Sequence, residues 1–393
     1  MKREQIGTSQ LFILMVAFQI GSSLIFPLGL KSGQNAWLAA LLGMFFGILV
    51  VFVFLRLFSH FQRDSLIQII LGLLGRGLGV PLCLTYIVYF TYEASRVVRD
   101  FSELLAATIL VDTPQSVIIV CFIAVIIYTL RGGIEVFGRM AEMVFPFVMI
   151  VMGITWFTVY ASGAFKIRHL TPIMFSGSAN IWREAFPDLT VLPYGELIVF
   201  IMLWPFLGGK GKLSKISLAA VLTGGLLLTI NILAMLAVLG PELYGILKYP
   251  LLASVRMVSI GDFLERIDAV VILLMVAGGF FKIGVYVYGA ALGTAHLFKL
   301  KSPCDVMVPL GAIIAPFSLV MAENSGIHSK IGLGFDVKYV HLTLQIIIPS
   351  LLLLLSFLKL KKDGKEQTGQ EGPLRDNNGN MENGDKGQAE GEP

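Results

Sequence analysis

Long apolar stretches alternate with short polar ones along most of the chain. A helix that crosses a bilayer needs about 20 mainly apolar residues, and ten stretches approach that length. The pattern therefore predicts an all-α polytopic membrane protein with about ten transmembrane helices. We expect these helices at residues 8–30, 36–57, 81–110, 115–130, 134–160, 190–207, 217–239, 263–298, 306–321 and 340–358.

Composition and charge support this prediction. Of the 393 residues, 56% are hydrophobic and 14% are charged, whereas soluble domains carry about 25% charged residues. The net charge of +4 is not gathered into the basic face that binding to nucleic acid requires. Lys and Arg are more frequent at alternate helix ends, which favours both termini on the cytoplasmic side. Residues 1–360 form one transmembrane domain on this interpretation, and the polar residues 361–393 form a disordered cytoplasmic tail.

The sixth apolar stretch is interrupted by residues that do not suit a regular helix. Pro193 removes a backbone donor, and Gly195 weakens the helix around it. Tyr194 and Glu196 lie at the same interruption. A charge and irregular backbone are tolerated at membrane depth only where protein or a water-filled cavity covers them. We therefore expect a broken helix whose interruption faces the interior.

The first stretch contains a second interruption, at Gly21, Ser22 and Ser23. Segments one and six would then begin two five-helix halves, at about residues 6–160 and 188–358. Broken helices at matching positions are typical of inverted-repeat transporters, whose sites lie at the breaks. Alternatively, the small residues only allow close helix packing. If a second half-helix begins after Ser23, its free N–H groups suit a carboxylate. Glu196 suits an ammonium group, so the pair of breaks favours a zwitterion such as an amino acid.

Charged residues also occur inside two other predicted helices. The third helix has one polar face, formed by residues spaced three and four apart: Tyr86, Tyr89, Glu93, Arg96 and Asp100. Because a charge facing lipid costs several kcal/mol, roughly 2.5–3.5 on insertion scales, this face points into the bundle. Glu93 is nearest the midplane and is a candidate for a polar pathway or binding site. Arg96, Arg99, Asp100 and Glu103 equally suit a salt-bridge network that joins helices.

Lys282 lies near the middle of the eighth predicted helix. A buried ammonium group needs a carboxylate or carbonyl partner, and Glu93 and Glu196 are the candidates. The ammonium group could stand in for a coupling cation or titrate as a buried Lys can, or the pair could be a fixed structural ion pair. The histidines are scattered, and the chain has no phosphate-binding loop, zinc-protease motif or nucleophile elbow. The sequence therefore predicts no enzyme, cofactor or metal site.

Several short motifs occur in an order that resembles a known family. They are Ile6-Gly7-Thr8-Ser9-Gln10-Leu11-Phe12, Gly21 followed by Pro27, Arg99-Asp100-Phe101-Ser102-Glu103 before Thr113-Pro114, Pro193-Tyr194-Gly195-Glu196, Tyr249-Pro250, Phe263-Leu264-Glu265-Arg266-Ile267-Asp268 and Phe280-Phe281-Lys282. Together they resemble the spore germination permease family, the membrane-embedded B subunits of nutrient germinant receptors. That family is placed in the amino acid–polyamine–organocation superfamily. The resemblance covers about residues 4–360.

The resemblance implies a site and a function. It implies a protein of the inner membrane of the bacterial spore that works with germinant receptor A and C subunits. The nutrient, an amino acid on the charge argument, would bind between helices one, three, six and eight. By position, the site would contain Gly21, Ser22, Ser23, Tyr89, Glu93, Tyr194, Gly195, Glu196 and Lys282. The main alternative is an autonomous proton-coupled amino-acid transporter, and a further one is a structural scaffold whose breaks serve packing.

Overall fold

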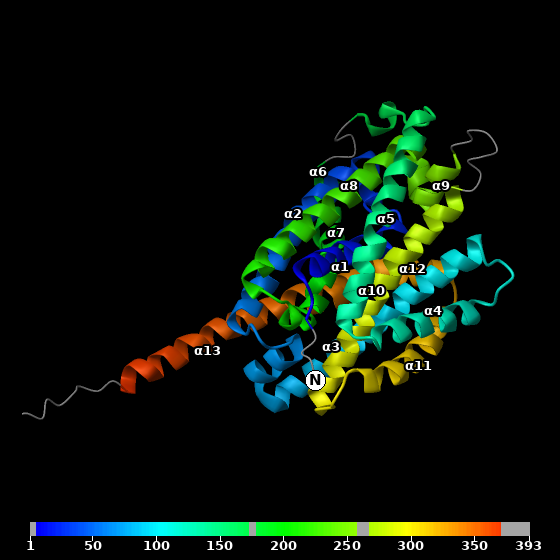
Figure 1. The fold of residues 1–393 in the computed structure, drawn as a ribbon. Coiled ribbons are helices and arrows are strands. Elements are labelled where there is room, and N and C mark those ends of the chain that lie inside the picture. Colours follow the sequence, from blue (N-terminus) through cyan, green and yellow to red (C-terminus); the bar gives the residue numbers. More distant parts are fainter. Residues whose placement is uncertain (1–4, 173–177, 258–266, 371–393) are drawn as a thin grey trace, which may run out of the picture.

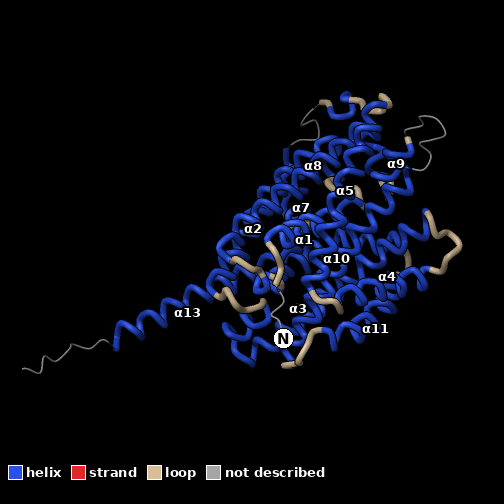
Figure 2. The backbone as a smooth tube through the Cα atoms, in the orientation of Figure 1, coloured by secondary structure: helices blue, strands red, loops and turns tan. Residues whose placement is uncertain are grey.

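A computed structural model describes residues 5–172, 178–257 and 267–370. Within these ranges the chain is helical, without strands (Figure 2), apart from an isolated bridge between Ile6 and Leu207. Seven helical segments are long and apolar enough to cross a membrane, and three shorter apolar helices accompany them. Each corresponds to one of the ten predicted stretches. The prediction of an all-α polytopic membrane protein is therefore confirmed.

The first five predicted segments form five main helices. They are α1 (Thr8–Gly21), α2 (Ala36–His60), α3 (Leu66–Thr108), α4 (Gln115–Leu130) and α5 (Ile134–Ala161). Short 3₁₀ turns lie at η1 (Ser22–Leu24), η2 (Leu30–Asn35) and η3 (Ile167–Leu170). α3 begins earlier than predicted, and it turns at Gly75, whose φ of 68° is readily adopted only by glycine.

The second half is less regular. Its elements are α6 (Ser178–Arg183), η4 (Glu184–Asp188), α7 (Leu189–Val191), η5 (Gly195–Met202), η6 (Trp204–Phe206), η7 (Lys210–Lys212), α8 (Leu213–Ile246), α9 (Pro250–Arg256), α10 (Ile267–Phe298), α11 (Cys304–Val320), α12 (Ser325–Lys330), η8 (Ile331–Ile347) and α13 (Ile348–Gln370). η5 and η6 are 3₁₀ helices, whereas η4 and η8 have the wider π-helical hydrogen bonding.

Two predictions concern residues that lie partly outside the described ranges. The motif residues Phe263, Leu264, Glu265 and Arg266, which open the eighth predicted segment, lie outside the described ranges. α13 continues to Gln370, past the expected start of the tail, and its end projects from the bundle (Figures 1 and 2). Residues 371–393 are outside the described ranges, so the expected disorder of the tail stays a prediction.

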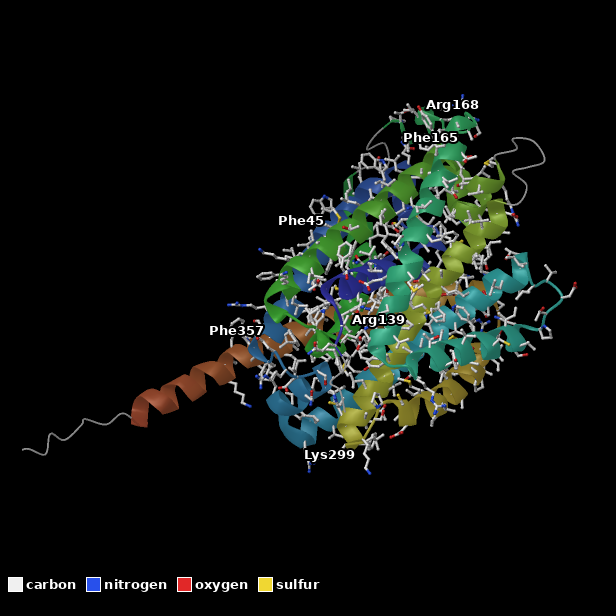
Figure 3. All side chains as sticks on the ribbon, in the orientation of Figure 1. Phe45, Arg139, Phe165, Arg168, Lys299 and Phe357 are labelled. Atoms are coloured by element: carbon white, nitrogen blue, oxygen red, sulfur yellow. The ribbon has the colours of Figure 1, made fainter. Side chains whose placement is uncertain are left out.

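Apolar side chains cover the outside of the bundle. Phe45 and Phe357 point outward (Figure 3) and are 55% and 42% exposed. Charged side chains lie inside instead, since Lys282 and Glu93 are 1% and 3% exposed. A lipid environment explains this arrangement. Apolar side chains can face the hydrocarbon, whereas polar side chains need partners and find them inside the protein.

α1 and α10 lie in the middle of the bundle (Figure 1). α10 packs along α3 and also contacts α1 and α5, and α8 packs against α1 and α2. Near the start of the chain, the Ile6 N–H donates to the Phe206 carbonyl at 2.9 Å, and the Gly208 N–H donates to the Ile6 carbonyl at 3.1 Å. The beginning of the first segment is therefore joined to the end of the sixth.

Candidate functional site

The first predicted break is present. α1 ends at Gly21, and one 3₁₀ turn, Ser22–Leu24, follows it. The Ser23 hydroxyl donates to the Gln19 carbonyl at 2.8 Å, which satisfies an acceptor at the helix end. The chain then runs without helix to η2, so the expected second half-helix after Ser23 is wrong. Its N–H groups therefore cannot form the expected carboxylate site.

The break in the sixth segment is also present, and the chain does resume as a helix. α7 ends at Val191, residues 192–194 form a turn, and the 3₁₀ helix η5 begins at Gly195. Gly195 lies against the end of the Gln345 side chain, where an added Cβ would collide with Gln345 Oε1. This turn carries Glu196 into the interior, at the start of η5.

Glu196 and Lys282 form a buried ion pair. Lys282 Nζ lies 2.6 Å from Glu196 Oε2, and the side chains are 1% and 2% exposed. Lys282 also donates to Ser22 Oγ at 2.7 Å, and the Tyr286 hydroxyl donates to Glu196 Oε1 at 3.0 Å. Of the two partners expected for Lys282, the structure pairs it with Glu196. The pair joins both breaks to α10, and we call these four residues the central cluster.

Aromatic rings surround the central cluster. Lys282 Nζ lies 5.2 Å from the centre of the Phe18 ring, a distance suited to a cation–π contact. The Phe18 ring in turn packs against Phe200 and Tyr286 at 5.3 and 5.1 Å between centres. Rings exclude water, and an ion pair interacts more strongly in a medium of low dielectric constant. The cluster is therefore closed in this conformation.

Gly21 sets the distance between the first break and α10. A Cβ at Gly21 would lie 2.8 Å from the Gly278 carbonyl oxygen, and one at Gly278 would lie 3.0 Å from Gly21 Cα. The two backbones are therefore in contact, which brings Ser22 within reach of Lys282. Close packing and a polar contact of Ser22 occur together at this break, so the structure confirms the packing alternative, and a ligand site here stays a prediction.

Tyr194 lies away from the central cluster. Its ring packs against Gly47 of α2, and its hydroxyl would lie 2.7 Å from a Cβ added at Gly225 of α8. The side chain is 2% exposed. The structure thus places Tyr194 in the packing between helices, on a different side of the sixth segment from Glu196.

Tyr89 and Glu93 belong to a second polar group, which we call the α3–η8 cluster. The Tyr89 hydroxyl lies 2.8 Å from His341 Nδ1, and Gln345 Nε2 donates to Tyr89 at 2.6 Å. His341 Nε2 lies 3.8 Å from Glu93 Oε1. His341 and Gln345 were missed as site residues. Their only sequence signal is a polar pair four residues apart in an apolar helix, which places both on one face.

Further along α3, the polar face forms the predicted salt-bridge network. The pairs are Arg96–Asp336 at 3.2 Å, Asp100–His328 at 2.8 Å, Arg99–Glu103 at 2.9 Å and Lys248–Glu103 at 2.8 Å. Lys248 lies between α8 and α9, outside the spanning segments. Its partial burial disfavours the charged form, but the hydrogen bond to Glu103 and the interactions with Tyr249 and the Glu103 charge together outweigh this and raise the pKa of Lys248. This network joins α3 to η8, to α12 and to the connection between α8 and α9.

The nine predicted site residues thus divide into groups. The central cluster contains Ser22, Glu196 and Lys282, and Gly21 and Gly195 shape it from the backbone. Tyr89 and Glu93 lie in the α3–η8 cluster, whereas Ser23 caps its own helix and Tyr194 serves packing. In the described part of the chain, no group of three or more His, Cys, Asp or Glu side chains could hold a metal ion.

Comparison with known proteins gives consistent matches. A family model described as spore germination protein matches residues 5–326. The chain is 31% identical to spore germination protein KB of Bacillus subtilis (strain 168) over 93% of this chain and 98% of that protein. It is 23% identical to spore germination protein YndE of the same organism, over 92% of this chain and 98% of the relative. Spore germination protein B2 of that organism is also 23% identical, over 85% and 89% of the two chains.

Proposed function

Because the chain belongs to the spore germination protein family, we propose that it is the membrane subunit of a nutrient germinant receptor. On this proposal it lies in the inner membrane of the spore with both termini on the cytoplasmic side. It binds a small nutrient, an amino acid, and passes the signal to A- and C-type partner subunits. Residues 6–160 and 188–358 act as the two inverted repeats around the site.

The central cluster is the observation that carries this proposal. Lys282 and Glu196 present one positive and one negative group, 2.6 Å apart, between both breaks. A zwitterion can replace the contact between these two side chains, since its carboxylate suits Lys282 and its ammonium group suits Glu196. Ser22 adds a hydroxyl next to Lys282. Lys282 thereby binds the carboxylate of the nutrient, the role that the sequence assigned to a half-helix after Ser23.

Signalling requires two conformations with different affinities for the nutrient. In the closed conformation, Lys282 and Glu196 satisfy each other and the surrounding rings exclude water. A bound zwitterion separates the two side chains and gives each a new partner. Since Lys282 is on α10 and Glu196 on η5, this separation changes how α10 packs against the sixth segment. The movement of these two elements is the signal that the partner subunits receive.

Ligand-induced thermal stabilisation of the purified protein tests the proposal. A ligand at about 100 times its dissociation constant stabilises the folded state by about 2.7 kcal/mol, so one amino acid of a panel raises the unfolding midpoint. Glu196→Gln abolishes that rise, because it removes the charge for the ammonium group. Glu135→Gln is the matched control, since Glu135 pairs with Arg139 on the exposed surface of α5.

Two outcomes would contradict this assignment. If a sugar or nucleoside stabilises the protein and no amino acid does, the nutrient class is wrong. If spores carrying Glu196→Gln or Gly21→Leu germinate normally, the site is wrong. Accumulation of an amino acid by proteoliposomes that contain this chain alone, driven by a pH gradient, would instead identify the autonomous transporter.

A further inference from the structure

Among the described residues, the α3–η8 cluster contains two buried oxygen atoms without hydrogen-bond partners. They are Glu93 Oε1 and Gln345 Oε1, and their side chains are 3% and 0% exposed. An unpaired polar atom in an apolar interior is costly, and an unpaired carboxylate is much more so. Glu93 must therefore either find a cation or carry a proton.

In the part of the chain that the structure describes, the charged groups that act on Glu93 leave no cation for it. They are Glu196 of η5, Arg96 of α3, Asp336 of η8 and Lys282 of α10. Lys282 is paired with Glu196 at 2.6 Å, and Arg96 is paired with Asp336 at 3.2 Å. Each cation already has one carboxylate, so an ionised Glu93 would be an excess negative charge in the interior.

His341 does not supply that cation. Its Nδ1 atom lies 2.8 Å from the Tyr89 hydroxyl and 3.0 Å from Gln345 Nε2. Because the amide nitrogen of Gln345 can only donate, Nδ1 acts as the acceptor. The ring is then neutral and carries its hydrogen on Nε2, the atom that faces Glu93 Oε1 at 3.8 Å. This distance is too long for a hydrogen bond, although a small movement of η8 would form one.

We propose that Glu93 and His341 form a proton-binding site, separate from the central cluster. The Glu93 carboxyl holds a proton in the closed conformation. When the cluster takes in water, the carboxyl O–H bond breaks, the proton passes to water, and the carboxylate remains. The His341 Nε2–H group then donates to that carboxylate and stabilises it. The imidazole stays neutral throughout.

The element that carries His341 and Gln345 suits this movement. η8 is π-helical over 17 residues, and π-helical turns are rare and often occur at functional sites. Gln345 also touches Gly195, the residue before Glu196. A shift of η8 would therefore reach both Glu93 and the break that positions Glu196. The proton site itself does not depend on the proposed nutrient.

Infrared spectroscopy of the purified protein, without any nutrient, tests the proposal. We expect a carbonyl band of a protonated carboxylic acid at neutral pH that is absent in Glu93→Gln and unchanged in Glu135→Gln, because Glu135 pairs with Arg139 on the exposed surface of α5. Glu93→Gln keeps the shape of a protonated carboxyl, so it should fold. A spectrum in which Glu93→Gln removes no such band would overturn the proposal.

A second variant tests the part played by His341. The Glu93 band should disappear as the pH rises, because the carboxyl then ionises. In His341→Phe the carboxylate loses its donor, so the disappearance should move about one to two pH units higher. His296→Phe is the control, because His296 bonds to Ser65 and not to this cluster. An unchanged titration in His341→Phe would show that the histidine takes no part. Because no nutrient is present, these results are independent of the proposed receptor function.

Discussion

The turn after α1 and the turn before η5 both end a helix inside the bundle, but they contribute different things to the central cluster. After α1, the backbone of Gly21 touches that of Gly278, and only the Ser22 hydroxyl reaches Lys282. Before η5, Gly195 lies against the Gln345 side chain, and the long side chain of Glu196 brings a full charge to Lys282. The first break is thus held by packing, and the second by electrostatics. Substitutions at the two breaks should therefore differ in how much stability they cost and in which second substitution restores it.

Loss of the ion pair should have the largest effect. Lys282→Met leaves Glu196 buried without a cation, which costs about 3–5 kcal/mol. We expect a marked fall in the unfolding midpoint of the purified protein. The double variant Lys282→Met with Glu196→Gln removes both charges and should recover much of the loss. If Lys282→Met alone is as stable as the parent protein, the pair does not stabilise the second break.

The packing of the first break should be the next most sensitive feature. Gly21→Ala places a methyl group 2.8 Å from the Gly278 carbonyl oxygen, and backbone cannot move aside as easily as a side chain. Overpacking of this kind costs about 1–3 kcal/mol, measured by the same unfolding midpoint. Gly153→Ala is the control, because a Cβ at Gly153 meets no atom within 4 Å. Equal midpoints for the two variants would mean that α1 and α10 do not depend on this contact.

A methyl group at the second break should cost less. Gly195→Ala displaces the end of the Gln345 side chain, which can rotate away and give up its hydrogen bond to Tyr89. We expect a loss of about 0.5–1.5 kcal/mol. Adding Gln345→Ala should remove the collision, so that the double variant shows little further loss. A larger effect at Gly195 than at Gly21 would reverse the proposed contrast between the breaks.

Tyr194 should have the smallest effect on ligand binding. Tyr194→Phe keeps the ring that packs against Gly47 and removes only the hydroxyl. The stabilisation by an amino acid should therefore be unchanged, whereas it is lost in Glu196→Gln. A thermal shift assay on both variants makes this comparison. If Tyr194→Phe abolishes the response, the residue contacts the nutrient as the sequence suggested.

The sequence predicts the spanning segments well, because a stretch of apolar residues in lipid has few alternatives to a helix. It also narrows the partner of Lys282 to two carboxylates, since a buried ammonium group requires one. Four glycines at positions 72, 75, 77 and 79, followed by Pro81, conceal the start of α3. α2 packs with α8, and α3 packs with α10; in the predicted repeat these are the second and third helices of each half. The inverted repeat itself stays a prediction.

Other features depend on contacts that local sequence does not contain. The absence of a helix after Ser23 has a local cause instead, because Pro27 restricts the residue before it and Gly29 adopts a φ of 77°. The direction of Tyr194 depends on the rotation of an irregular segment. His341 and Gln345 became site candidates only when η8 placed them beside Tyr89 and Glu93. The sequence therefore indicates the depth of each polar group in the membrane, but not which polar groups of different helices contact one another.

The short bridge between Ile6 and the end of the sixth segment has a mechanical consequence. It joins α1 and the sixth segment at one end by backbone hydrogen bonds, which no ligand needs to break. The same two segments are joined again through Ser22, Lys282 and Glu196, by side chains that can exchange partners. The two segments are therefore held by backbone hydrogen bonds at one end and by exchangeable side-chain bonds at the other. On the proposed function, release at the central cluster would let the two segments separate at that end, while the backbone hydrogen bonds of Ile6 hold the other end together.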